Sequence, residues 1–208
     1  MICENNIEPR RAAWTRRVRF AALPVIATGM LAFSGCSDMV RTGQGSSFLT
    51  ITTLGGASGS STTFGPVLQS DVVSDSGGIF QDSGQASFQL QMKDVGGPGP
   101  SPNNAITITQ YHVEFVRSDG HNVQGVDVPF AFDGGASVTI NGSGGSLTGF
   151  TLVRIQAKQE APLAALAHGG GANTITTIAR VTFFGHDQTG REVSVTGSIE
   201  VEFADWAG

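Results

Sequence analysis

Cysteine is almost absent from this chain. Of its 208 residues only two are cysteine, Cys3 and Cys36, and both lie near the N-terminus. A disulfide framework needs paired cysteines within the folding domain, so none can form in residues 37–208. Whatever folds there is stabilised by packing alone.

Positive charge is scarce outside the N-terminal segment. Five of the 12 Lys and Arg residues lie in residues 1–19, together with two of the 17 Asp and Glu residues, which leaves 7 basic and 15 acidic side chains in the rest. Nucleic-acid binding needs clustered cations that neutralise phosphates, and anionic lipid attracts basic surfaces, not acidic ones. The charge balance therefore excludes nucleic acid as a partner and argues against the domain itself lying on an anionic membrane.

No apolar run of the chain is long enough for a stable membrane span. Residues 20–33 form an apolar stretch of 14 residues, whereas a spanning helix needs about 20. A basic segment precedes it, with Arg10, Arg11, Arg16, Arg17 and Arg19. A basic segment followed by about 7–15 apolar residues is typical of a secretory signal peptide.

The four residues Phe33-Ser34-Gly35-Cys36 follow this stretch. They resemble the lipobox of bacterial lipoproteins, usually Leu-(Ala/Ser)-(Gly/Ala)-Cys, with Phe33 in place of Leu. The resemblance implies that Cys36 carries a diacylglycerol on its thiol and an acyl chain on its amino group. It also implies cleavage before Cys36, which frees the amino group for acylation. Lipid on both groups fits the rule that stable membrane anchoring takes more than one chain. The alternative is an ordinary signal peptide with a chance cysteine.

Two further features concern export. Residues 15–20, TRRVRF, resemble the twin-arginine motif, so the general secretory and twin-arginine routes both stay open. Ser37 after the cysteine would favour sorting to an outer membrane. We expect a bacterial cell-envelope protein that meets the membrane through its lipid, faces the periplasm or the cell surface, and has an envelope or surface protein as partner. No other cofactor is expected.

The remaining chain divides into a tether and one domain. Residues 1–35 form the expected signal peptide, residues 36–46 the lipidated cysteine and a flexible tether, and residues 47–208 a single domain. The domain is rich in Gly, Ser, Thr and Val, a composition that favours strands. Period-2 alternation predicts about eight strands, within residues 47–54, 66–73, 86–95, 105–116, 126–135, 149–163, 174–185 and 191–203.

Local signals refine this pattern. The phase of the alternation changes near Thr109–Gln110, which predicts a β-bulge. Asp187 to Gly190 form a turn that predicts a hairpin of the last two strands, and Pro129 indicates an edge or strand end. We expect only a short helical turn, within residues 161–171. The pattern predicts an all-β, antiparallel two-sheet β-sandwich. Over residues 47–205 it resembles immunoglobulin- or fibronectin-like modules, without the Cys…Trp…Cys mark of true immunoglobulin domains.

Catalytic motifs are incomplete. Residues 168–171, HGGG, resemble the oxyanion-hole motif of lipases and esterases, but no Gly-x-Ser-x-Gly elbow accompanies them. The four histidines do not stand at metal-pair spacing. We therefore predict no catalytic residues, no metal site built on histidine, and a protein that is not an enzyme.

Acidic residues in loops are the next candidates, because calcium takes oxygen ligands from carboxylates and carbonyls. Such residues are Asp119, Asp127, Asp133 and Asp187. The alternative is that they shape tight turns, since Asp-Gly pairs commonly do so.

Aromatic residues give the only indication of an interaction surface: Phe130, Phe132, Phe183 and Phe184. Phe183 and Phe184 are consecutive, so they must point to opposite faces of a strand, and one of them leaves the core if only one face is buried. The alternative is that a second layer of structure covers it. The function expected is a non-enzymatic, lipid-anchored domain that acts in protein–protein contact or envelope structure. The alternative is a carbohydrate- or other ligand-binding module with a loop-built site, assisted by calcium.

Overall fold

The computed structural model describes residues 45–169 and 172–206. The expected signal peptide, Cys36 and most of the tether lie outside these residues and stay predictions. Within the described ranges no helix is long and apolar enough to cross a membrane.

Eight strands confirm the all-β prediction. They are β1 (Ser47–Ala57), β2 (Val67–Asp71), β3 (Asp82–Met92), β4 (Ile106–Val116), β5 (Phe132–Ile140), β6 (Gly145–Val153), β7 (Ile175–Asp187) and β8 (Glu192–Ala204). The helical parts are short: η1 (Pro102–Asn104), α3 (Ile155–Gln159) and η2 (Leu163–Leu166).

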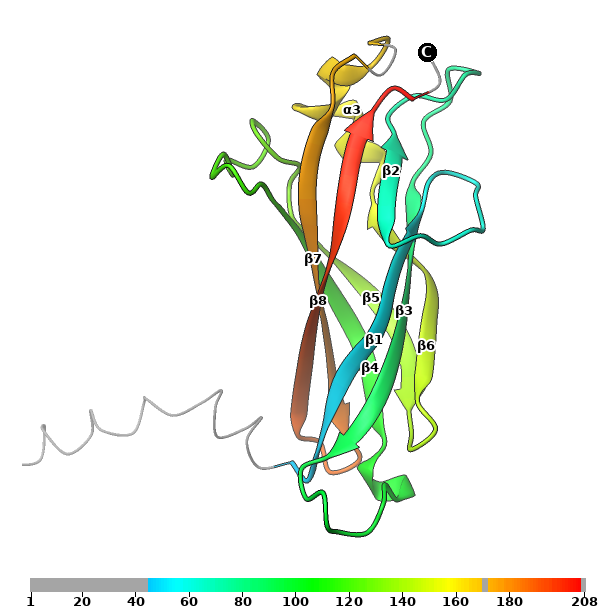
Figure 1. The fold of residues 1–208 in the computed structure, drawn as a ribbon, viewed down its shortest axis with the longest axis vertical. Helices are drawn as coiled ribbons and strands as arrows, with labels where there is room; N and C mark the ends of the chain where they lie inside the picture. The colour runs from blue at the N-terminus through cyan, green and yellow to red at the C-terminus, as the bar shows by residue number, and fades with distance from the viewer. Residues whose placement is uncertain (1–44, 170–171, 207–208) are drawn as a thin grey trace, which may run out of the picture. The chain divides into compact units, whose positions relative to one another are not determined.

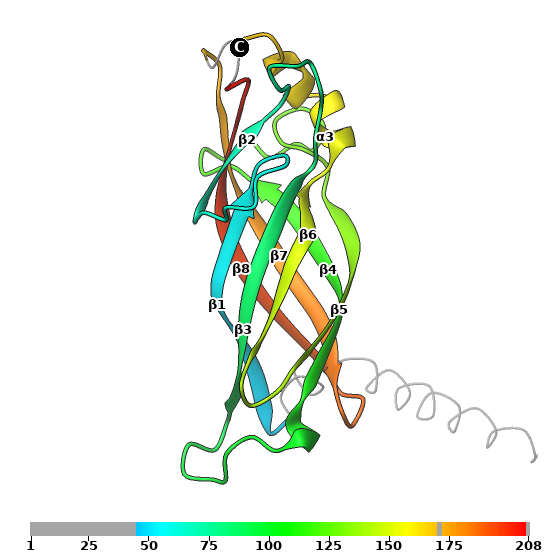
Figure 2. The same cartoon turned by 90° about the vertical axis from the view of Figure 1, so that its right-hand side faces the viewer.

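The strands form two sheets, which Figures 1 and 2 show from two sides. One sheet has the order β1-β3-β6 and the other the order β2-β8-β7-β4-β5. All neighbours are antiparallel except β2 and β8, which run parallel. The five-stranded sheet curls around the core.

Several local predictions are confirmed. The register of β4 shifts between Ile108 and Gln110 against both of its neighbours, which places the predicted bulge. Residues 188–191 join β7 to β8 as a hairpin. In the second half of β8 the odd-numbered residues Val201 and Phe203 are fully buried, because one face of this strand packs on the core.

Two predicted strands are wrong in part. Residues 126–131 belong to a loop, and β5 begins only at Phe132. Val126 is 66% exposed although Val128 is fully buried, so the apolar alternation there does not mark one face. Strand β6 ends at Val153, and α3 follows in place of a continued strand. Periodicity does not separate a strand from a helical turn in so short an apolar run.

An aromatic cluster of four rings fills the space between the sheets. Phe183 lies at the centre, with ring centroids 4.9 Å from Phe88 and 5.4 Å from Phe150, both edge-on. Tyr111 packs on Phe150 at 5.2 Å, and its hydroxyl accepts a hydrogen bond of 3.1 Å from the backbone N–H of Thr151. These rings join the two sheets without a disulfide, as the scarcity of cysteine requires.

The strand directions give the domain two ends. We call the end where the described chain begins the entry end; it holds residues 45–46, 93–105, 141–144 and 188–191. The opposite end, which we call the loop end, holds residues 72–81, 117–131, 154–169, 172–174 and 205–206. Most of the long connections therefore lie at the loop end.

Candidate functional site

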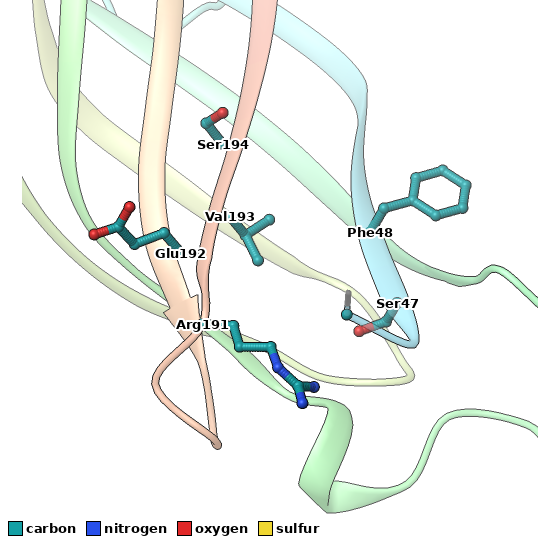
Figure 3. Close-up of a pocket in the computed structure, with 7 residues that line it drawn as sticks. Ser47, Phe48, Arg191, Glu192, Val193 and Ser194 are labelled. Atoms are coloured by element: carbon teal, nitrogen blue, oxygen red, sulfur yellow. The ribbon is translucent and has the colours of Figure 1, made fainter. Parts of the chain in front are cut away.

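A hollow of about 70 Å³ lies at the entry end, between the start of β1 and the start of β8. Residues 45, 47, 48 and 191–194 line it, and Figure 3 shows the Arg191 side chain reaching toward Ser47. Pockets that bind small molecules usually measure about 300–1,000 Å³. This hollow is suited to a few water molecules.

Each of the acidic residues considered as a calcium ligand contacts neighbouring groups of the protein. Asp119 pairs with the guanidinium of Arg117, and Asp127 accepts a hydrogen bond of 3.0 Å from the backbone N–H of Val123. In the next strand Asp133 Oδ1 lies 2.8 Å from Nδ1 of His112. Among the described residues no three His, Cys, Asp or Glu side chains gather closely enough to hold a metal ion.

Asp187, the fourth candidate, shapes the β7–β8 turn. Its Oδ1 accepts hydrogen bonds from the hydroxyl and N–H of Thr189, at 2.6 and 2.8 Å, and from the N–H of Arg191 at 3.0 Å. Burial opposes ionisation, but these bonds outweigh it and lower the pKa of Asp187 below its usual value of 3.8. This carboxylate therefore stabilises a turn.

The four aromatic candidates do not form one surface. Phe183 is 1% exposed and Phe132 is 9% exposed, so both belong to the core. This corrects their prediction as surface residues, because the inner side of each strand carries them. Phe184 is exposed on the outer face of β7, between Gln110 and Ser194 in register. Phe130 is exposed in the loop between β4 and β5.

A buried ion pair lies beneath the loop end. Lys158 of α3 is 1% exposed, and its Nζ lies 2.8 Å from Oδ1 of the fully buried Asp82 at the start of β3. Nζ also donates to the backbone oxygen of Asp71 at 2.7 Å. Asp82 accepts further bonds from the Ser70 hydroxyl at 2.6 Å and the Gly59 N–H at 2.9 Å. The pair thus ties four separate segments together.

A second carboxylate at this end is less favourably placed. Burial raises the pKa of Asp71 above its usual value; the N–H of Trp206 counteracts this, and the nearby charge of Asp205 adds to it. Asp205 is 4% exposed. The fold therefore disfavours the ionised form of Asp71.

The connection between β4 and β5, residues 117–131, projects from the loop end, on the left in Figure 1. We call it the β4–β5 loop. The side chain of Asn122 accepts a hydrogen bond of 2.6 Å from the N–H of Arg117. The N–H of Gly125 donates to the oxygen of Val128 at 2.8 Å, and the N–H of Ala131 to the side chain of Gln124 at 3.2 Å. These bonds hold the loop in one conformation.

Three apolar side chains of this loop point into solvent. Val123 is 60% exposed, Val126 66% and Phe130 47%, and we call them the apolar tip. Elsewhere on the loop end Phe80, Ile155 and Trp206 are also exposed. Isolated exposed apolar residues are ordinary, whereas contiguous exposed apolar patches commonly mark interaction sites.

Sequence reasoning found Phe130 and missed the rest. Val126 was assigned to a strand face, and Val123 was not singled out. Lys158 and Asp82 lie 76 residues apart, so no local pattern connects them. The alternation places Lys158 with Arg154 and Gln156 on the polar face of the expected strand, so the sequence gives no signal that it is buried.

Comparison with protein-family models finds no match for this chain, and searches among curated proteins and solved structures find none either.

Proposed function

We propose that this protein is a lipid-anchored, exported, non-enzymatic domain that works by protein–protein contact at the bacterial cell envelope. One observation carries the proposal. Six of the eleven exposed large apolar side chains of the described residues lie at the loop end, five of them in loops and Ile155 in α3. An anchor at the N-terminus would present this end to a partner.

The lipobox at Cys36 supplies the anchor in this proposal. The tether of 11 residues, 36–46, would reach at most roughly 35–40 Å when fully extended. That length lets the domain tilt and turn near the membrane while it remains attached. The low proportion of basic residues fits a domain that faces water beside the lipid surface.

The strand order supports an immunoglobulin-like sandwich within this proposal. The order β1-β3-β6 matches strands A, B and E of that fold, and β8-β7-β4-β5 matches strands G, F, C and C′. In true immunoglobulin domains a disulfide joins strands B and F beside a tryptophan of strand C. In this chain Phe88 lies on β3 and Phe183 on β7, the strands that correspond to B and F, and their rings are in contact. Tyr111 lies on β4, which corresponds to strand C.

The alternative, a ligand-binding module with calcium, has less support. The four loop acids are engaged locally, and the hollow at the entry end is small. Carbohydrate modules also need aromatic side chains arranged side by side, and Phe184 lies among polar neighbours.

A cross-linking pull-down from native membranes tests the proposed function. Wild-type protein and Cys36→Ala are compared, and mass spectrometry of the purified wild type looks for the acylated N-terminal cysteine. We expect one defined protein to be captured by the wild type and much less by the unanchored variant. Capture of no protein by either form, with binding to a glycan array by both, would overturn the proposal.

A further inference from the structure

We propose that the buried pair of Lys158 and Asp82 condenses to an intramolecular amide, which cross-links α3 to the start of β3. Nζ of Lys158 becomes bonded to Cγ of Asp82, and one water molecule is released. This modification belongs to the domain itself and does not depend on its partner. Three features support it: the burial of the pair, the contact between its atoms, and the hydrogen-bond donors around the carboxylate.

The burial of Lys158 is exceptional for a lysine. The chain contains only two lysines, Lys93 and Lys158, and this residue type is almost never fully buried. Here the side chain of Lys158 is 1% exposed and that of Asp82 is fully buried. Two buried charges cost free energy that their attraction repays only when the geometry is excellent. Condensation removes both charges from the interior.

The chemical nature of the cation distinguishes this pair from the others. The carboxylates of Asp119 and Asp133 contact arginine and histidine, respectively. These side chains do not form stable amides with a carboxylic acid, whereas the primary amine of a lysine does. Among the ion pairs described above, the pair of Lys158 and Asp82 is therefore the one that can condense.

The two reacting groups are held in contact. Nζ lies 2.8 Å from Oδ1 of Asp82, and this oxygen is bonded to the Cγ that Nζ must attack. A second bond, of 2.7 Å from Nζ to the backbone oxygen of Asp71, fixes the position of the ammonium group. Well-oriented groups in one molecule react with effective concentrations that can reach roughly 10⁵–10⁸ M. Such positioning compensates for the low reactivity of a carboxylic acid toward an amine.

The hydrogens of the ammonium group balance the reaction. One proton moves from Nζ to Oδ1 along the 2.8 Å contact, which leaves a neutral amine and a neutral carboxylic acid. The lone pair of Nζ then attacks Cγ, and the electron pair of the C=O bond moves onto Oδ2. When this pair returns, the bond between Cγ and Oδ1 breaks, and Oδ1 leaves as water with a second proton from Nζ. The third hydrogen stays on Nζ as the amide N–H.

Hydrogen-bond donors surround both carboxylate oxygens. The Ser70 hydroxyl donates to Oδ2 at 2.6 Å, where negative charge develops during the attack, and fixed donors at such an oxygen stabilise the transition state strongly. The Gly59 N–H donates to Oδ1 at 2.9 Å, and the Ser58 hydroxyl lies 3.4 Å from it. Ser58 and Gly59 are only partly buried, so the released water has a path to solvent beside them.

The amide gives the domain a covalent cross-link that cysteine cannot supply. Residues 37–208 contain no cysteine, and the two linked residues lie 76 positions apart in the chain. A cross-link that closes a long loop stabilises a protein mainly by restricting its unfolded state, as a disulfide does. Packing is then not the only support of the fold.

The test uses the protein purified from its native membrane, denatured and digested with trypsin. Trypsin does not cleave after a lysine whose Nζ is in an amide. We therefore expect wild type to yield residues 42–93 joined to residues 155–180, with a mass one water molecule below the sum of the two peptides. Mass spectrometry of fragments locates the link at Asp82 and Lys158.

Lys158→Arg is the matched control, because arginine keeps the positive charge but its guanidinium does not attack a carboxylic acid. We expect this variant to yield residues 42–93 unlinked, with cleavage after position 158. Ser70→Ala removes the donor to Oδ2 and keeps both reacting groups. We expect it to cross-link at least about 100-fold more slowly after synthesis, and an equal rate would contradict the role of the hydroxyl. Thermal unfolding of each variant shows that its fold is intact.

The wild-type digest alone decides the proposal, whatever the stability of the variants. Cleavage after Lys158 with residues 42–93 recovered unlinked overturns it. Loss of water confined to a linear peptide also overturns it, because Asp-Gly pairs such as Asp119-Gly120 lose water when they form a succinimide. Neither result bears on protein–protein contact, which the pull-down tests separately.

Discussion

Asp187 at the entry end and Asp71 at the loop end differ in how well the fold stabilises their ionised forms. At the entry end the Asp187 carboxylate accepts three hydrogen bonds within one short turn, and its pKa is lowered. At the loop end burial and the charge of Asp205 raise the pKa of Asp71, and an ion pair is buried beneath the surface. The fold therefore favours the ionised form of Asp187 and disfavours that of Asp71.

The largest effect is expected at the buried ion pair. Lys158→Met removes the cation and leaves the Asp82 carboxylate buried, which should cost about 3–5 kcal/mol in the free energy of unfolding. Chemical denaturation followed by circular dichroism measures this change. Arg191→Met at the exposed entry end is the matched control and should stay within about 0.5 kcal/mol. Equal effects of the two variants would contradict a stabilising role of the Lys158–Asp82 pair.

A smaller loss is expected at the entry end. Asp187→Ala leaves the N–H groups of Thr189 and Arg191 without their acceptor, which should cost about 1–2 kcal/mol. Because the folded pKa of Asp187 is lowered, its stabilising contribution is complete above the usual value of 3.8 and is lost as pH falls through the folded value. Unfolding curves between neutral and acidic pH measure it. A variant as stable as wild type at neutral pH contradicts the role of this carboxylate.

At the loop end, removal of a carboxylate charge is expected to raise the free energy of unfolding instead of lowering it. Asp71→Asn keeps an oxygen that accepts the Trp206 N–H and removes the charge, so it should stabilise the protein by less than about 1 kcal/mol at neutral pH. The pKa of Asp71 is raised in the folded state, so ionisation destabilises the fold above that pKa. This destabilisation decreases as the pH falls below the folded pKa and is lost below the usual value of 3.8. Melting temperatures at neutral and mildly acidic pH check this. If Asp71→Asn destabilised the protein at neutral pH, the expected difference between Asp71 and Asp187 would be contradicted.

The smallest effect is expected on the sheet face between the ends. The ion pair of Arg180 and Glu114 spans 3.4 Å with both side chains about half exposed. Surface pairs of this kind contribute little. Arg180→Ala should change the free energy of unfolding by less than about 0.5 kcal/mol, as measured by chemical denaturation. A loss as large as that of Asp187→Ala would indicate that stability is not concentrated at the ends.

Sequence patterns predicted the strands whose two faces differ clearly. In β8 apolar and polar residues alternate from Val193 to Phe203, and the burial follows them. The register shift in β4 was likewise visible as a change of phase. The pattern failed in residues 126–131, where Val128 alone is buried and hydrogen bonds of side chains override the alternation. The alternation also failed after Val153, where Lys158 is buried because its ammonium group pairs with the carboxylate of Asp82.

The candidate site was less predictable than the fold. Phe130 was found because an aromatic residue beside a turn is noticeable, but its neighbours in the apolar tip are valines of ordinary appearance. Their exposure depends on a turn closed by the oxygen of Val123. The core positions of Phe132 and Phe183 depend on which face of the sheet is covered, and that follows from contacts between strands far apart in the chain.

The parallel pairing of β2 with β8 has a mechanical consequence. Val67 pairs with Glu200 and Asp71 with Ala204, so the two strands point the same way. A pulling force between an anchored N-terminus and the C-terminus acts along both strands in opposite directions. It therefore shears the hydrogen bonds between them together instead of opening them one after another. A force applied in this way therefore meets the five residue pairs of β2 and β8 at once.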